Sequence, residues 1–191
     1  SSDGPLPIGG QANDFLISPN GAYTVYRAGQ DVVEIAQLYA TRTDGSGPSV
    51  RLSALPQAGQ YIKGYNISPD NARVIYIADQ DTRNVIELYS APLNGSAAAV
   101  KLNRPLVAGG SLPDNFTGFQ ISADSRRVVY RADGDTDEIA ELYSAPIDGS
   151  AAAVKLNGRL VAGGEVYQFA ITPDGASVVF TADKNTGHVV E

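Results

Sequence analysis

Carboxylate side chains recur at odd-numbered spacing within one predicted turn, residues 133–141. Acidic residues stand at positions 1, 3, 5 and 9 of this segment, and position 7 offers a backbone carbonyl. A hard cation such as calcium takes several oxygen ligands at roughly 2.3–2.6 Å, and this spacing in a tight loop brings oxygens together. The segment therefore predicts a calcium site. Its ligands would be Asp133, Asp135, Asp137, Ile139 and Glu141.

Two further segments keep part of this pattern. Their predicted ligands are Asp79, Asp81 and Glu87 in one segment, and Asp183, Asn185 and Glu191 in the other. Arg83 stands at position 5 of the former and would bring a positive charge there. A fourth copy contains Gly29, Asp31, Val33 and Gln37, and we predict that it is metal-free. Alternatively, the acidic side chains of all copies only make Asx-type turns at exposed hairpin tips.

Other kinds of chemistry find little support in these residues. His188 is the single histidine and cysteine is absent, so a zinc site or a Ser-His-Asp triad lacks its parts. Most carboxylates recur at the same repeat position, which indicates structure and not one catalytic acid–base pair. The repeated tyrosines are interpreted as packing residues. They are Tyr39, Tyr89 and Tyr143. We therefore predict that this segment is not an enzyme.

The composition suits one folded domain with an acidic surface. The chain has 191 residues, 43% of them hydrophobic, and a formal net charge of −7. An acidic balance disfavours nucleic acid and anionic membranes as partners, and it leaves cations plausible. No apolar run is long enough to cross a bilayer, so membrane insertion is not predicted.

The elements that would hold the acidic turns come from an internal repeat. Four segments of one pattern begin at Ile17, Ile67, Ile121 and Ile171, at spacings of 50, 54 and 50 residues. Such a period is the sequence signature of a repeat architecture. We place the repeats at about 15–64, 65–118, 119–168 and 169–191, the last one incomplete, within a single domain of residues 1–191.

Each full repeat shows four short strand signals separated by turn residues. The first strand ends at an Ile-Ser or Ile-Thr pair, which precedes a turn that contains Asp or Asn. The second strand, Arg73–Ala78 in one copy, is almost continuously apolar, so we expect both of its faces to be covered. The third strand contains Leu-Tyr, and an Asn-Gly or Asp-Gly pair leads to the fourth. This pattern predicts an all-β chain that forms a β-propeller of four-stranded antiparallel blades, with about three and a half repeats present.

The segment Ile67–Tyr76, together with the following Leu88-Tyr89, resembles the TolB-type, WD-like propeller repeat. This resemblance covers residues 5–191 and implies a bacterial protein of the periplasm, the cell surface or the extracellular space. The Asp133 turn resembles the calcium-binding hairpin loops of integrin-type propellers, which follow D-x-D-x-D-G-x-x-D. Here Glu138 replaces the Gly of that pattern, and Glu141 replaces its last Asp.

Two functions are compatible with this fold, which alone does not choose between them. The first is a non-catalytic module for protein interaction or self-assembly, stabilised by calcium. The second is the propeller part of a larger hydrolase, such as a serine peptidase, which a Gly-x-Ser-x-Gly motif beyond Glu191 would reveal. We favour the first. Because three and a half blades would expose apolar faces, we expect a longer chain, an oligomer or a filament.

Overall fold

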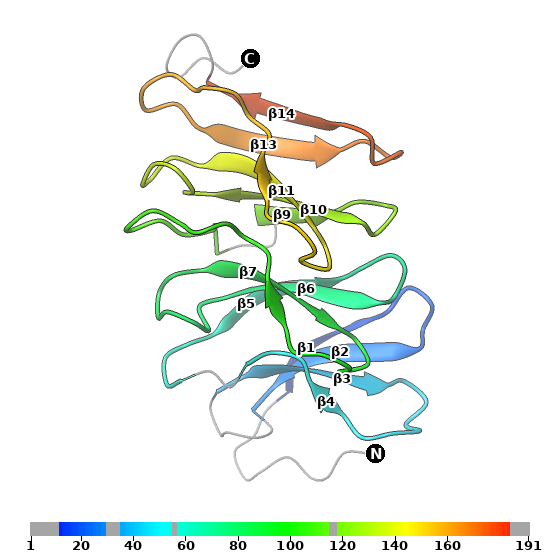
Figure 1. The fold of residues 1–191 in the computed structure, drawn as a ribbon. Coiled ribbons are helices and arrows are strands. Elements are labelled where there is room, and N and C mark those ends of the chain that lie inside the picture. Colours follow the sequence, from blue (N-terminus) through cyan, green and yellow to red (C-terminus); the bar gives the residue numbers. More distant parts are fainter. Residues whose placement is uncertain (1–11, 30–34, 55–56, 115–117, 184–191) are drawn as a thin grey trace. The chain divides into compact units, whose positions relative to one another are not determined.

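The computed structural model describes residues 12–29, 35–54, 57–114 and 118–183 of the chain. The chain forms two compact units, Ser1–Lys101 and Leu102–Glu191. The elements of the described ranges are antiparallel strands in three four-stranded sheets and one two-stranded sheet (Figure 1). This confirms the predicted all-β class. Within the same ranges, no helix is long and apolar enough to cross a membrane.

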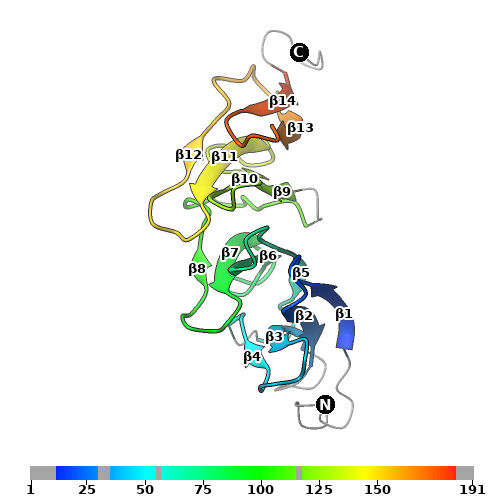
Figure 2. The same ribbon diagram turned by 90° about the vertical axis from the view of Figure 1, so that its right-hand side faces the viewer.

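The strands of each sheet follow one another in sequence order. The first unit contains the sheets β1-β2-β3-β4 and β5-β6-β7-β8. Their strands are β1 Ala12–Ile17, β2 Tyr23–Ala28, β3 Gln37–Arg42, β4 Val50–Arg51, β5 Ile62–Ile67, β6 Arg73–Ala78, β7 Glu87–Pro92 and β8 Val100–Lys101. The second unit contains β9-β10-β11-β12 and β13-β14 (Figure 2). Their strands are β9 Phe119–Ile121, β10 Arg127–Ala132, β11 Glu141–Pro146, β12 Val154–Lys155, β13 Val166–Ile171 and β14 Val178–Ala182.

A serine hydroxyl closes the turn between the first two strands of the repeat. Ser68 Oγ donates to Asp70 Oδ1 at 2.5 Å and accepts from the backbone amide of Arg73 at 3.0 Å. Asn71, between them, has a φ of 63°, which Asn tolerates better than most residues. The same bonds join Ser122 to Asp124 and Thr172 to Asp174. The turn chemistry predicted from the sequence is thus what ends β5, β9 and β13.

The first strand of three sheets begins about three residues before the repeat boundary that the sequence suggested. In β1, β5 and β13 the pairing register shifts by one residue near the start, as in a β-bulge. Because a bulge absorbs an extra residue without ending the ladder, pairing continues back to Ala12, Ile62 and Val166. Whether residues 1–191 form one domain stays a prediction.

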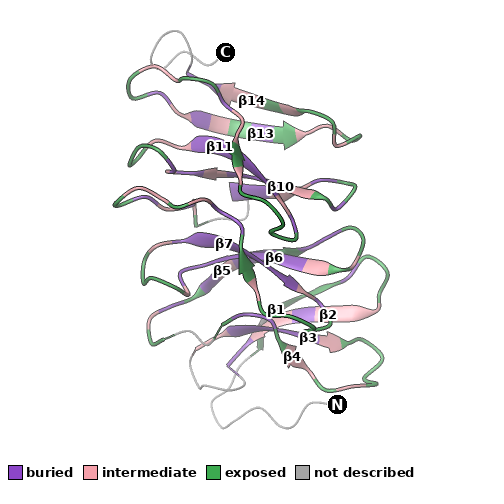
Figure 3. Cartoon of the chain, in the orientation of Figure 1, coloured by how far each residue is buried: buried purple, intermediate pink, exposed green. Residues whose placement is uncertain are grey.

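The second strand of the second repeat, β6, is buried on both faces, as its apolar sequence predicts. Val74 to Ala78 of β6 are all buried (Figure 3). Cross-strand tyrosine pairs add to the packing, with ring centroids 5.3 Å apart for Tyr76 and Tyr89 and 5.5 Å apart for Tyr130 and Tyr143. The three tyrosines interpreted as packing residues, Tyr39, Tyr89 and Tyr143, are 3% exposed or less, which confirms that interpretation.

Neighbouring sheets within each unit pack face to face. In the first unit, Val25 and Leu38 of the first sheet belong to one apolar cluster with Tyr65 and Tyr76 of the second. In the second unit, Val129 and Leu142 of β10 and β11 join Val166 and Phe169 of β13. We call the face of a sheet that carries Val25 or Val129, and that packs on the following sheet, the outgoing face. We call the opposite face, which carries Tyr65 or Phe169 and packs on the preceding sheet, the incoming face.

In each unit, an arginine on the outgoing face of the first sheet donates a hydrogen bond to the next sheet. Arg27 Nη1 donates to the carbonyl of Ile62 at 2.8 Å, and Arg131 Nη1 donates to the carbonyl of Val166 at 3.2 Å. The two arginines hold the same register position in β2 and β10. Since Ile62 and Val166 both lie at the start of the next sheet's first strand, the two units repeat one contact.

Candidate functional site

The predicted calcium turn follows β10 and leads into β11. Its third and ninth residues meet at a lysine: Lys155 Nζ of β12 donates to Asp135 Oδ2 at 3.0 Å and to Glu141 Oε1. Glu141 also accepts from the Tyr143 hydroxyl at 2.6 Å and from the Asp135 amide at 2.8 Å. Arg104 Nη1 lies 3.3 Å from Asp135 Oδ1. We call Asp135, Glu141, Tyr143 and Lys155 the lysine cluster.

The remaining predicted ligands of this turn lie apart from the lysine cluster. A Cβ at Gly109 would be 2.6 Å from Asp137 Oδ2, so the Asp137 carboxylate covers that glycine. Asp133 is half-buried, and burial raises the pKa of its carboxyl, with a further contribution from the charge of Asp137. The Ile139 amide donates to the Thr136 carbonyl at 3.3 Å, which closes a turn.

The second repeat carries the same cluster. Lys101 Nζ lies 2.8 Å from Asp81 Oδ2 and 2.7 Å from Glu87 Oε1. The Tyr89 hydroxyl donates to Glu87 Oε2 at 3.0 Å. Burial alone would lower the pKa of the Lys101 ammonium, but its bonds to Asp81 and Glu87 outweigh burial and raise the pKa above its usual range. The same balance raises the pKa of Lys155.

Two of the acidic turns begin with a buried aspartate whose carboxylate accepts hydrogen bonds. Asp79, only 2% exposed, accepts from the amides of Tyr61 at 2.5 Å and Asn84 at 3.1 Å. Asp183 is fully buried and accepts from the Tyr167 hydroxyl at 2.6 Å. None of these contacts is the bond to the amide two residues further on that defines an Asx turn, so the Asx-type interpretation stays a prediction. The predicted ligands Asn185 and Glu191, and also His188, lie outside the described residues.

The first repeat differs from the cluster at two positions: a neutral glutamine replaces the glutamate, and an arginine replaces the lysine. Gln37 stands where the other repeats have Glu, and the Tyr39 hydroxyl donates to its Oε1. Arg51 pairs with Tyr39 at the register position that Lys101 and Lys155 hold in their sheets. The acid and the lysine have therefore been replaced together.

An ammonium group occupies part of the predicted calcium site. Among the described residues, no group of three or more Asp, Glu or His side chains could hold a metal ion. Positions 3 and 9 already hold an ammonium group, which an arriving cation would have to displace. One feature does match the calcium-loop pattern: Glu138 has a φ of 59°, the left-handed conformation that the Gly of that pattern supplies. Calcium binding at the Asp133 turn stays a prediction.

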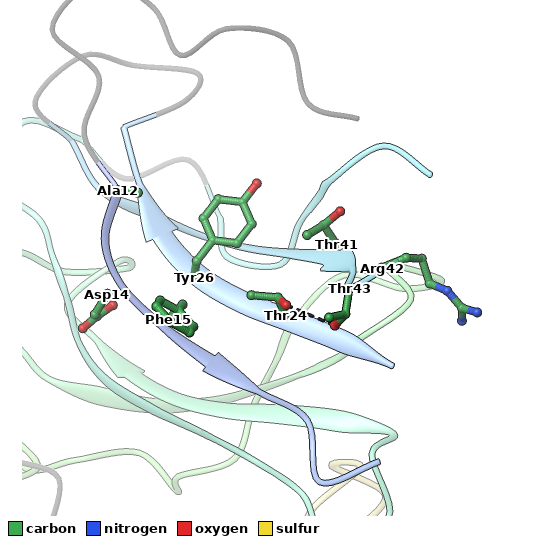
Figure 4. Close-up of a pocket in the computed structure, with 8 residues that line it drawn as sticks. All are labelled: Ala12, Asp14, Phe15, Thr24, Tyr26, Thr41, Arg42 and Thr43. Carbon is green, nitrogen blue, oxygen red and sulfur yellow. Dashed lines mark hydrogen bonds between the residues drawn. The ribbon is translucent and has the colours of Figure 1, made fainter. Parts of the chain in front are cut away.

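A second candidate site is the incoming face of the first sheet. Phe15 and Ile17 of β1 are 64% and 54% exposed, whereas Tyr65 and Ile67, at the same register positions of β5, are 2% and 7% exposed. An open pocket of about 660 Å³ lies on this face. Figure 4 shows its lining, with Thr24 and Thr43 joined by a hydrogen bond of 3.1 Å. The lining residues are Ala12, Asp14, Phe15, Thr24, Tyr26, Thr41, Arg42 and Thr43.

Comparison with known proteins supports the fold. No protein-family model matches the sequence, and no curated protein matches it. Among solved structures, the chain is similar to TolB from Acinetobacter baumannii, with a TM-score of 0.51 and 13% sequence identity. The fold is TolB-like, at a distant level. The match covers 92% of this chain and 38% of the TolB chain, so this chain spans well under half the length of that protein.

The sequence reasoning missed the two lysines of the clusters. Lys101 and Lys155 both lie 14 residues after the glutamate that they bind. The signal was present, because the repeat that has Gln37 in place of glutamate also has Arg51 in place of lysine. The second and third repeats thus each carry an internal cation, a lysine, at their acidic turn.

Proposed function

We propose that this chain is part of a TolB-like β-propeller that works as a non-catalytic module for protein interaction or self-assembly. We place it outside the cytoplasm, in the periplasm, at the cell surface or in the extracellular space. The likeness to TolB in fold and the resemblance of its repeats to the TolB type support this proposal. A longer propeller, an oligomer or a filament would each satisfy it.

The observation that carries the proposal is the exposure of one repeated position. In each unit, the aromatic residue that opens the incoming face of the second sheet is buried by the sheet before it: Tyr65 is 2% exposed and Phe169 is 9% exposed. Phe15 holds the same position in the first sheet and is 64% exposed. The equivalent faces of the second sheet in each unit are thus covered by protein. The exposed face of the first sheet is therefore suited to contact with another protein surface.

The pocket on this face has poor means for catalysis. Asp14 is the one carboxylate in its described lining, and it binds the Arg27 guanidinium and, at 2.9 Å, the Tyr65 hydroxyl. Burial alone would raise the pKa of Asp14, but these two partners outweigh burial and lower the pKa below its usual range. A carboxylate held in this way is a poor proton acceptor near neutral pH. The lining therefore favours binding over turnover.

A photo-crosslinking amino acid at Phe15 tests the proposal in the cells that make the protein. We expect adducts with a protein, either a copy of this chain or another one, because the face is suited to coverage by protein. The same group at Ser46, an exposed residue of the loop after β3, is the control and should give none. Absence of adducts at Phe15 above the control, or turnover of peptide or ester substrates that one Asp or Ser substitution abolishes, would refute the proposed function.

A further inference from the structure

The incoming face of the first sheet has a counterpart in the last sheet. Val179 of β14 is 64% exposed and pairs with Ala170 of β13, which is also exposed. Val179 holds the register position of Val25 in β2, which is 0% exposed within the first unit's apolar cluster. The outgoing face of β13-β14 is thus uncovered at a position that the first unit buries.

The two exposed faces are the two halves of one contact that occurs inside the chain. In the first unit, the outgoing Val25 and the incoming Tyr65 share a cluster, and the Tyr65 hydroxyl lies 3.5 Å from the Val25 carbonyl. Val179 corresponds to Val25, and Phe15 corresponds to Tyr65. The register therefore matches Val179 of one sheet with Phe15 of another.

Contacts in the second unit give the matching backbone positions. Gln120 on the outgoing side of β9 donates through Nε2 to the Phe169 carbonyl at 3.0 Å, and its Oε1 accepts from the Ile171 amide at 3.2 Å. Ala170 holds the position of Gln120 in its own sheet, and Ile17 holds the position of Ile171. An equivalent contact would bring Ala170 of one sheet close to Ile17 of another.

Resting on the proposed function, we propose that a second copy of this chain covers the incoming face of β1-β2 with the outgoing face of its β13-β14 sheet. The contact is head-to-tail, since different faces meet. Such heterologous contacts build rings or open filaments, and not closed two-fold dimers. The partner is thus specified as the face that carries Ala170 and Val179.

Disulfide trapping tests this contact directly because the chain has no cysteine of its own. Two single variants, Ile17→Cys and Ala170→Cys, are oxidised separately and as a mixture. We expect the mixture to give a crosslinked heterodimer and each variant alone to give far less. Equal crosslinking of Ile17→Cys with itself, or no crosslink in the mixture, would overturn the proposal.

Sedimentation of the 191-residue chain provides a second test. We expect a mass above the 20.0 kDa of one chain, together with a loss of association of about tenfold or more in Ile17→Lys and in Val179→Lys, since each would bury a charge in the contact. Val154→Lys, at a residue of β12 that is 52% exposed, is the matched control and should associate like the unchanged chain. Circular dichroism checks that each variant is folded.

The two proposals fail in different ways. If crosslinks from Phe15 lead to a different protein and the cysteine mixture stays monomeric, the head-to-tail contact is refuted and the interaction module stands. If no protein is crosslinked at Phe15 at all, the interaction module is refuted as well. A stable 20.0 kDa monomer at every concentration measured would also refute the head-to-tail contact.

Discussion

The first and third repeats supply the same buried hydrogen-bond acceptor with two different residues. In the third repeat, Glu141 is 4% exposed and binds Lys155, whereas in the first repeat the neutral Gln37 is 0% exposed and binds Tyr39. Both residues begin the third strand of their sheet and accept a hydrogen bond from a tyrosine two residues later. The comparison teaches that the fold needs a buried acceptor at this position, and that the charge is added only where a lysine accompanies it.

Removing the lysine from the third repeat should have the largest effect. Lys155→Met leaves Glu141 buried without its cation. We expect a loss of about 2–3 kcal/mol in the free energy of unfolding, less than for a fully buried pair because Lys155 keeps some contact with water. Urea denaturation measures it. Glu141→Gln combined with Lys155→Met supplies a neutral acceptor, as Gln37 does in the first repeat, and should recover most of the loss; no recovery would contradict the comparison.

The converse change places a charge in the first repeat. Gln37→Glu buries a carboxylate opposite Arg51 and should cost about 1–2 kcal/mol. Adding Arg51→Lys supplies an ammonium at the register position of Lys155 and should restore stability. Melting temperatures of the single and double variants decide this. A double variant no more stable than Gln37→Glu would show that register alone does not build the cluster.

Alkaline pH should destabilise the chain through the second and third repeats, whose clusters contain a lysine. The pKa of Lys101 and that of Lys155 are raised in the folded chain above the ordinary value of 10.5. A raised lysine pKa contributes stability that is complete below the unfolded pKa and is lost as pH rises through the folded pKa. We expect stability to fall above about pH 10.5, and to fall less in a variant with both Lys101→Met and Lys155→Met. Thermal melts at rising pH measure this, and parallel curves would argue against it.

Calcium should have the smallest effect, because it must compete with an ammonium. For the chelator-treated chain at millimolar calcium, we expect a stabilisation of less than about 1 kcal/mol. Lys155→Gln removes the ammonium group from Asp135 and Glu141 and should respond more strongly, and Asp133→Ala should remove any response. Calorimetric titration gives the comparison. A response of the unchanged chain equal to that of Lys155→Gln would mean that the lysine and calcium do not compete.

Local turn chemistry explains how much of this fold the sequence predicted. Ser68 and Asp70 act on neighbours within five residues, so their effect is readable from a short stretch of sequence. The lysine cluster depends on the pairing of β11 with β12, which places Lys155 beside Tyr143 from 12 residues away along the chain. Whether the aromatic residue at the Phe15 position is exposed depends on whether another sheet packs against it. A sequence pattern shared by all repeats does not carry that information.

The serine–aspartate turns also imply an order of events as the chain folds. The Ser68 turn joins β5 to β6 across a few residues, so this hairpin closes with little loss of chain entropy, on a timescale of about 1–10 μs. The bond from Tyr65 to Asp14 spans 51 residues and has to form later. We therefore expect Asp70→Ala to slow refolding and Asp14→Asn mainly to speed unfolding, as stopped-flow measurements would show. In this chain the hairpins would be the early nuclei, and the packing of sheet on sheet would be the late step.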